Sequence, residues 1–366
     1  MTVHVTTPTP AQSPPASSVG IIGWLRKNLF SSVANSIFTL LGLFLIYKTV
    51  PPALNWALFT ADWVGTTKEA CTSDGACWVF VSVRIKQFLF GFYPPSEYWR
   101  VVTSFSLAGI LIAWLLMERT PKKGLVAAFT VFIYPVIAYF LFYGGLGLPV
   151  VETHRWGGLM LTLILATIGM FCALPIGIVL ALGRRSSMPI AKSISVVFIE
   201  FWRGVPLITV LFMSSVMLPI FMPEQWQIDK LLRALIGIIF FQSAYMAEVV
   251  RGGLQAIPKG QYEAAEALGL SYWKTMFFII LPQALKLVIP GIVNTFIALF
   301  KDTTLVLIIG LFDLLAVVQA AFADPKWLGF SVEGYVFVAS VYWVSCFSMS
   351  RYSQHLEKKL HTGHAR

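Results

Sequence analysis

The chain has 366 residues, of which 57% are hydrophobic and 12% are charged, with 27 Lys and Arg against 17 Asp and Glu. Its mean hydropathy of +0.76 excludes a soluble globular protein and indicates a polytopic membrane protein. A formal charge of +10 would suggest nucleic acid as the partner of a soluble protein. Here the basic residues flank apolar stretches, as in membrane proteins, so we expect no nucleic-acid partner.

The first residues of the chain predict a tail rather than a signal peptide. The stretch from Met1 to Ser18 is rich in Thr, Pro and Ser, and it lacks both a basic start and an apolar core. Such a composition buries too little apolar surface to fold by itself. We therefore expect a disordered cytoplasmic tail over residues 1–28.

Apolar stretches of about 20 residues, the length that crosses a bilayer, recur along the rest of the chain. We count eight of them, at residues 29–50, 99–117, 125–143, 158–182, 192–219, 233–250, 283–300 and 331–350. The predicted fold class is an all-α polytopic membrane protein with about eight transmembrane helices. The first three spans form an N-terminal extension over residues 29–150, and the last five form a core over residues 151–350.

The basic loop residues indicate which way these spans face. The basic clusters beside the spans fall by alternation on one side of the membrane, whereas the loops on the other side are mixed or acidic, and positive loops stay cytoplasmic. These residues are Arg26, Lys27, Arg119, Lys122, Lys123, Arg184, Arg185, Lys192, Arg251, Lys259, Lys274, Lys358 and Lys359. Both termini are then cytoplasmic, including a C-terminal tail over residues 351–366, and the loop at 51–98 lies outside the membrane.

The outer loop at 51–98 contains a pair of cysteines and an aromatic run. Cys71 and Cys77 stand in polar sequence, so we expect a disulfide if the loop faces an oxidising space. No histidine lies near them, and the histidines of the chain have no neighbouring cysteine or carboxylate cluster, so we expect no metal site. The run from Trp78 to Tyr93 is amphipathic and is expected to lie along the outer membrane interface.

Two of the long apolar stretches contain charges beside helix-breaking residues. One is interrupted by Glu200, Arg203 and the Gly and Pro that follow, and the other by the run from Lys301 to Thr304. Such interruptions predict bent or discontinuous helices that line a polar path.

A polar segment between the sixth and seventh spans has a distinctive spacing, within a loop that we place at 251–282. Gln261-Tyr-Glu-Ala-Ala-Glu-Ala-Leu-Gly269 is followed after nine residues by Ile279 and then by Leu281-Pro282. The first part predicts a short exposed helix that ends at Gly269, and Ser271 is placed to cap the next helix. An ordinary surface helix would also contain Glu and Ala, but that interpretation leaves the spaced Gly and Ile-x-Leu-Pro unexplained.

This spacing resembles the EAA loop of ABC importer permeases, whose short helix docks on the ATPase subunit. The resemblance implies a five-helix type I ABC importer permease core. It also implies that coupling to an ATPase is carried by the positions that match the pattern. These are Glu263, Ala264, Ala265, Gly269, Ile279, Leu281 and Pro282.

Flanking runs narrow the resemblance to the polar amino acid branch of that family. They are Arg203-Gly-Val-Pro206, Ala244-Tyr-Met-Ala-Glu248, Ile257-Pro-Lys-Gly-Gln261, Leu281-Pro-Gln-Ala284 and Lys301-Asp-Thr-Thr304. With its three-span extension the chain is similar to the general L-amino acid permeases of Gram-negative bacteria, including the glutamate/glutamine/aspartate/asparagine type. This implies the inner membrane, a second homologous permease subunit, an ABC ATPase dimer that binds ATP and Mg, and a periplasmic amino-acid-binding protein.

A zwitterionic substrate at membrane depth needs hydrogen-bond donors for its carboxylate and acceptors for its ammonium. Gln242, Tyr245 and Glu248 recur every three residues, which places them in one stripe on a helix. The same charged groups could instead pair with each other or bond the backbone of a broken helix. The candidate substrate and translocation residues are Glu248, Arg203, Asn294, Thr303, Thr304, Lys301, Asp302, Gln242 and Tyr245.

No phosphate-binding G-x-x-x-x-G-K-[ST] loop occurs in the chain, so we expect a transport subunit without an ATPase site of its own, and no cofactor. The first alternative is a secondary amino acid transporter driven by an ion gradient, which would share the broken helices and buried charges. The second is a membrane scaffold or sensor. Neither class needs a docking helix for an ATPase.

Overall fold

The computed structural model describes residues 20–117, 119–223 and 228–360. The chain divides into two compact units, Met1–Val79 and Phe80–Arg366, and each is considered by itself. Among the described residues the fold is helical apart from the two-residue strand β1, Phe312–Asp313.

In the first unit, helix α1 covers Gly20–Asn28 and α2 covers Val33–Leu54. The expectation of disorder over residues 1–28 is therefore wrong for its last nine residues, and residues 1–19 lie outside the described part. Ser32 caps α2 by accepting a hydrogen bond from the Asn35 backbone N–H, which satisfies a donor at the start of the helix.

The polar loop of the first unit is closed by hydrogen bonds and a disulfide. The structure joins Cys71 to Cys77, whose Cα atoms are 5.6 Å apart. The Asp62 carboxylate accepts hydrogen bonds from the Ser73 backbone N–H at 3.0 Å and from its hydroxyl at 2.8 Å. The bond from the Ser73 N–H lowers the pKa of the Asp62 carboxyl.

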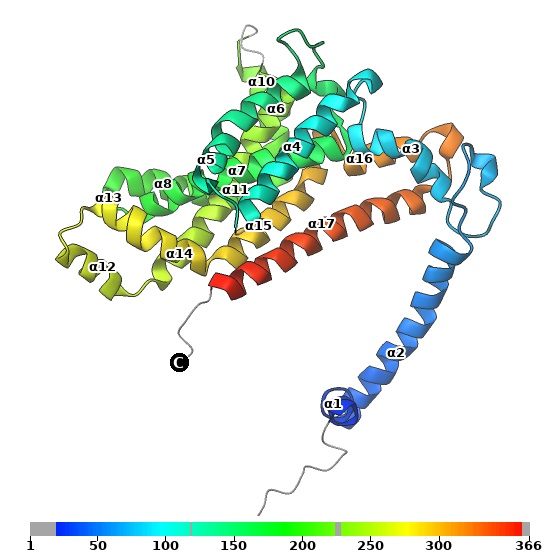
Figure 1. The fold of residues 1–366 in the computed structure, drawn as a ribbon, viewed down its shortest axis with the longest axis horizontal. Coiled ribbons are helices and arrows are strands. Elements are labelled where there is room, and N and C mark those ends of the chain that lie inside the picture. The colour runs from blue at the N-terminus through cyan, green and yellow to red at the C-terminus, as the bar shows by residue number, and fades with distance from the viewer. Residues whose placement is uncertain (1–19, 118, 224–227, 361–366) are drawn as a thin grey trace, which may run out of the picture. The chain divides into compact units, whose positions relative to one another are not determined.

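The second unit contains the remaining helices, which Figure 1 shows in chain order. Helix α3 begins in the first unit and runs into the second. The bounds are α3 Trp78–Phe90, α4 Tyr98–Leu116, α5 Lys123–Ala128, α6 Tyr134–Tyr143, α7 Gly158–Arg184, α8 Pro189–Gly204, α9 Leu207–Phe212, α10 Leu218–Phe221, α11 Lys230–Ala256, α12 Lys259–Ala267, α13 Tyr272–Thr275, α14 Leu281–Leu287, α15 Ile289–Asp302, α16 Leu314–Phe322 and α17 Ser331–Leu360.

Seven helical segments among the described residues are long and apolar enough to cross a membrane, or eight if one bent pair counts as a single span. The predicted all-α polytopic fold is thereby confirmed. The bent pair consists of α8 with the helices from Leu207 to Phe221, and its two arms meet at 103°. The helix breaks where the sequence predicted an interruption, because α8 ends at Gly204 and Pro206, two residues later, lacks a backbone N–H.

The predicted break near Thr303 is also present. Helix α15 ends at Asp302, a 3-10 helix covers Thr303–Ile309, and Gly310 then adopts a φ of 72°. The predicted seventh span is itself less regular than expected, because a π-helical turn at Met276–Ile280 precedes α14 and a turn at Val288 separates α14 from α15.

Helix α17 continues to Leu360, so most of the predicted C-terminal tail is an extension of the last span. Residues 361–366 lie outside the described part of the chain.

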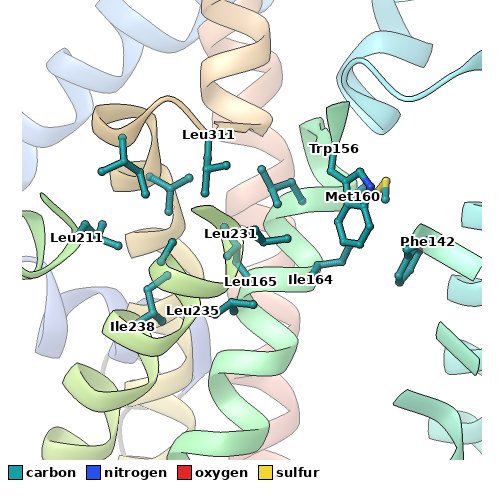
Figure 2. Close-up of a cluster of buried hydrophobic side chains, with 14 of the residues drawn as sticks. Phe142, Trp156, Met160, Ile164, Leu165, Leu211, Leu231, Leu235, Ile238 and Leu311 are labelled. Atoms are coloured by element: carbon teal, nitrogen blue, oxygen red, sulfur yellow. The ribbon is translucent and has the colours of Figure 1, made fainter. Parts of the chain in front are cut away.

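The core of the second unit lies between α7 and α11, which pack along each other (Figure 1). Figure 2 shows how Ile164 and Leu165 of α7 meet Leu231, Leu235 and Ile238 of α11. The cluster is completed by buried residues from α6, the turn before α7, α9 and the loop after the 3-10 helix: Phe142, Trp156, Leu211 and Leu311. Burying these side chains stabilises the packing around the break points, because it removes apolar surface from contact with water.

Candidate functional site

The predicted coupling segment forms a short helix that protrudes from the bundle. Helix α12 leaves Glu263 and Ala264 exposed and turns Ala265, which has no exposed surface, toward the bundle. Gly269 ends this segment with a φ of 69°, as the sequence predicted. Ser271 occupies the N-cap position of α13, but its side chain makes no capping hydrogen bond, so that part of the prediction is wrong.

The coupling segment shares an apolar core with the long helices. Ile280, Leu281 and Ala284, from the π-helical turn and α14, pack with Met246 and Val250 of α11. Ile279 is partly buried against this core, whereas Pro282 is exposed. A displacement of α12–α14 is therefore transmitted directly to α11, because a close-packed core resists compression.

A groove of about 420 Å³ runs beside α12. The Arg185 guanidinium donates a hydrogen bond to the Tyr262 hydroxyl at 3.4 Å and lies 5.9 Å from the centre of that ring. The Tyr262 hydroxyl in turn donates to the Leu254 carbonyl oxygen at 3.3 Å. The groove is lined by Arg185, Leu254, Gln255, Ile257, Lys259, Tyr262 and Glu263. These contacts join the coupling helix to the ends of α7 and α11.

Glu248 is the centre of a charged cluster near the same end of the bundle. Its carboxylate accepts hydrogen bonds from Arg251, with a closest distance of 2.7 Å. It also lies 2.9 Å from the Arg184 guanidinium and 3.7 Å from that of Arg203. Arg184 makes a second ion pair with Glu200, at 2.8 Å. We call Arg184, Glu200, Arg203, Glu248 and Arg251 the arginine–glutamate cluster.

The arginine–glutamate cluster joins α7, α8 and α11. The Glu248 side chain is only 16% exposed, whereas its partners are between 25% and 35% exposed. A carboxylate that is largely withdrawn from water needs such partners to stay ionised. Of the three arginines, Arg203 lies farthest from the Glu248 carboxylate. Its guanidinium also lies 5.7 Å from the ring centre of Tyr245.

The other predicted substrate residues occupy different environments. Asn294 and Lys301 are exposed and lie seven residues, or about two turns, apart on one face of α15. Thr303 has no exposed surface, and its hydroxyl donates to the Phe300 carbonyl oxygen at 2.8 Å. Gln242 is also buried, with 3% of its surface exposed.

Thr304 and the charged pair beside it belong to the break after α15. The Thr304 hydroxyl donates to the Lys301 carbonyl oxygen at 2.9 Å. Asp302 is half-buried, and in the described part of the chain no ion pair joins it to Lys301. The structure therefore assembles Arg203, Tyr245 and Glu248 as the sequence suggested, while the residues after Phe300 form a separate group.

Sequence analysis missed three members of the arginine–glutamate cluster as site residues. Arg251 could have been found, because it follows Glu248 by three residues on a helix and so shares its face. Arg184 and Glu200 come from other helices, and no local pattern connects them to Glu248.

A second cavity, of about 270 Å³, opens at the opposite end of the bundle. The Thr153 hydroxyl donates to the Asp229 carboxylate at 2.5 Å across it, and His154 lies 3.1 Å from Glu152. Its remaining lining comes from Tyr143, Lys230, Gly310 and Leu311.

Comparison with known proteins places these features in context. Residues 173–362 match the family described as "Binding-protein-dependent transport system inner membrane component". The chain is 61% identical to the inner membrane amino-acid ABC transporter permease protein YhdY of Escherichia coli, over 93% of each chain. It is 39% identical to the glutamate/glutamine/aspartate/asparagine transport system permease protein BztC of Rhodobacter capsulatus, over 96% of each chain.

A shorter relative matches only part of the chain. The probable glutamine ABC transporter permease protein GlnP of Bacillus subtilis is 32% identical, and the match covers 91% of that protein but only 55% of this chain. A little under half of this chain thus has no counterpart in that shorter permease.

Proposed function

Because this chain belongs to the family of binding-protein-dependent transport system inner membrane components, we propose that it is the permease subunit of an ATP-driven importer of amino acids. It is a multi-span protein of the bacterial inner membrane and works with an ATPase and a binding protein, as its family does. The observation that carries the proposal is the exposed helix α12, held on the core by Ala265 and ended by Gly269. An ion-driven secondary transporter has no use for this element.

The coupling residues take their roles from this geometry. Glu263 and Ala264 face outward from α12 and form the contact with the ATPase, which binds ATP and Mg. Ala265, Gly269, Ile279, Leu281 and Pro282 fix the shape of the segment that carries ATPase closure to α11. The coupling end and both termini are then cytoplasmic, as the basic loops indicate, and the Cys71–Cys77 loop is periplasmic.

The translocation path runs along the exposed face of α15. Asn294 and Lys301 lie on this face within a membrane-spanning helix, where exposure of polar groups to lipid costs several kcal/mol. A second, homologous permease subunit covers the face, and the path lies between the two. Arg203 and Tyr245 are accessible candidates for contact with the substrate, and Glu248 holds Arg203.

The predicted substrate and translocation residues that are buried act by positioning the backbone and neighbouring helices, without touching the substrate. Thr303 and Gln242 expose little surface, so they shape the path by holding the backbone at the break and by packing α11. Thr304 and Asp302 belong to the same break. Binding of substrate by the partner protein and closure of the ATPase then alternate the access of the path to the two sides of the membrane.

The proposal is tested by placing a bulky charge on the exposed coupling surface. The variant Ala264→Arg adds a guanidinium to an exposed position of α12, so the fold is expected to persist while the ATPase no longer binds. The matched control is Gln354→Arg, on the exposed side of α17. Both are purified with their partner subunits and assayed in vesicles for amino acid uptake.

We expect Ala264→Arg to lose the ATPase on purification and to lose ATP-dependent uptake, and Gln354→Arg to keep both. Uptake by Ala264→Arg that follows an imposed ion gradient without the ATPase would reject an ATP-driven importer in favour of a secondary transporter.

A further inference from the structure

The part of the N-terminal extension that lies in the second unit packs against the permease core through residues 80–91, most of them in helix α3. Phe80 and Phe88 of α3 have no exposed surface. The Phe80 ring centre lies 5.5 Å from that of Trp327 and 6.3 Å from that of Phe330, and Phe88 lies 5.4 Å from Phe337 of α17. One face of this run is therefore packed on protein, and its position along the membrane interface stays a prediction.

Glycines bring the backbone of the extension into direct contact with the start of α7. Gly91 bridges to Trp156, and a Cβ atom on Gly91 would lie 2.3 Å from the Gly157 Cα atom. A Cβ atom on Gly158 would lie 2.3 Å from the Phe88 carbonyl oxygen. No side chain separates the two backbones here, so these segments have no room to slide past each other.

The start of α7 also pairs with the strand β1, which precedes α16. Gly157 and Gly158 bridge to Phe312 and Asp313. Asp313 is fully buried and caps α16 by accepting hydrogen bonds from its first N–H groups, and the Tyr342 hydroxyl of α17 donates to it at 3.1 Å. Burial raises the pKa of the Asp313 carboxyl.

An ion pair also joins α3 to the turn between α16 and α17. Arg84 of α3 lies 2.5 Å from Asp324, in the turn between α16 and α17. The Lys326 backbone N–H and Arg84 both lower the pKa of the Asp324 carboxyl, so this carboxylate stays ionised at neutral pH. We call the contacts of residues 80–91 with the start of α7 and with the turn and helix after α16, together with the bridges from the start of α7 to β1, the outer clasp.

The other half of the core is built differently. Helix α8 meets the next helix at 103°, and π-helical turns interrupt the chain at Met213–Met217 and Met276–Ile280. Helices α7, α8 and α11 share a buried apolar cluster there, with Leu182 of α7 and Ile199 of α8 among its members. The same helices are also joined by the arginine–glutamate cluster, whose partly exposed ion pairs can exchange partners.

We propose that the outer clasp makes the part of the N-terminal extension from residue 80 onward a stator, which fixes the outer ends of α7, α16 and α17 as one rigid body. The movement that opens and closes the path then takes place between this body and the α8–α10 side of the core. This inference rests on the proposed transport function.

The test compares two reversible crosslinks in the complete transporter in vesicles. One variant carries Arg84→Cys with Asp324→Cys, across the clasp, and the other carries Arg184→Cys with Glu200→Cys, between α7 and α8. Both are made in a parent with Cys172→Ala and Cys346→Ala, and each is treated with a short bifunctional methanethiosulfonate. ATP-dependent uptake is measured before and after crosslinking of the same preparation.

We expect the clasp crosslink to leave uptake within about threefold of the untreated sample and the α7–α8 crosslink to lower it by about tenfold or more. A larger loss on crosslinking the clasp would overturn the stator, and so would retained uptake with α7 joined to α8. The treated parent controls for the reagent. Failure of the parent itself to show ATP-dependent uptake would instead reject the proposed transport function, so the two failures are distinguishable.

Discussion

The outer clasp and the end of the bundle that carries α12–α14, the coupling end, are held together by different kinds of contact. In the clasp, aromatic rings and backbone-to-backbone glycine contacts leave no space between the segments they join. At the coupling end, α7, α8 and α11 share a buried apolar cluster but also meet through five charged side chains that are partly exposed, and the π-helical turn at Met276–Ile280 lies directly after α13. Close packing resists displacement, whereas ion pairs near water can be remade at low cost.

Two glycines in the left-handed region show the same contrast. Gly91 and Gly269 have nearly equal φ values of 63° and 69°. A Cβ atom on Gly91 would strike backbone, but one on Gly269 would meet no atom within 4 Å. A glycine is thus required at position 91 by both the backbone conformation and the neighbouring atoms, and at position 269 by the backbone conformation alone.

The largest effect is expected from Gly91→Ala. A methyl group there adds overpacking to backbone strain, so we expect a loss of about 2 to 5 kcal/mol of folding free energy. Thermal unfolding of the detergent-solubilised protein measures it. Gly109→Ala on α4, where a Cβ atom meets nothing within 4 Å, is the control and should be at least as stable as the parent. Equal stability of the two variants would remove the steric basis of the clasp.

A smaller effect is expected at the arginine–glutamate cluster. Glu248→Gln leaves three arginines without their shared partner, and we expect a loss of about 1 to 3 kcal/mol, discounted for the exposure of those arginines. Glu200 is 55% exposed and pairs with one arginine, so Glu200→Gln should cost less than about 1 kcal/mol. Thermal unfolding with parallel uptake assays checks this order, and a reversed order would mean that Glu248 is not the centre of the cluster.

The smallest effect is expected from Ser271→Ala. Serine at an N-cap position normally contributes about 1 kcal/mol, but the Ser271 side chain makes no capping bond. We therefore expect a change within about 0.5 kcal/mol. Ser32→Ala, which removes the capping bond to Asn35, supplies the comparison. A larger loss at Ser271 than at Ser32 would contradict the geometry described for α13.

The sequence predicted the short helix α12 and its end at Gly269 because the information for them is local. A run of Glu and Ala, a stop at Gly269 and a fixed spacing to Leu281 all lie within about two dozen residues. The breaks at Pro206 and Thr303 were likewise visible as charges beside helix-breaking residues within apolar stretches.

The clasp could not be predicted in the same way, because its partners are distant in sequence. Arg84 and Asp324 are 240 residues apart, and nothing in the aromatic run at 78–93 identifies α17 as the surface that it covers. The amphipathic pattern was recognised, but a membrane interface and a protein surface select the same pattern.

The central claim, a fixed clasp against a movable coupling end, is tested most directly by spin-label distances in the complete transporter. One pair of labels, at Lys86→Cys and Lys326→Cys, spans the clasp, and a second, at Lys192→Cys and Lys274→Cys, connects α8 to α13; all four positions are exposed. We expect ATP binding to change the clasp distance by less than about 2 Å and the other by more. A clasp distance that changes as much as the distance from α8 to α13 would contradict the account.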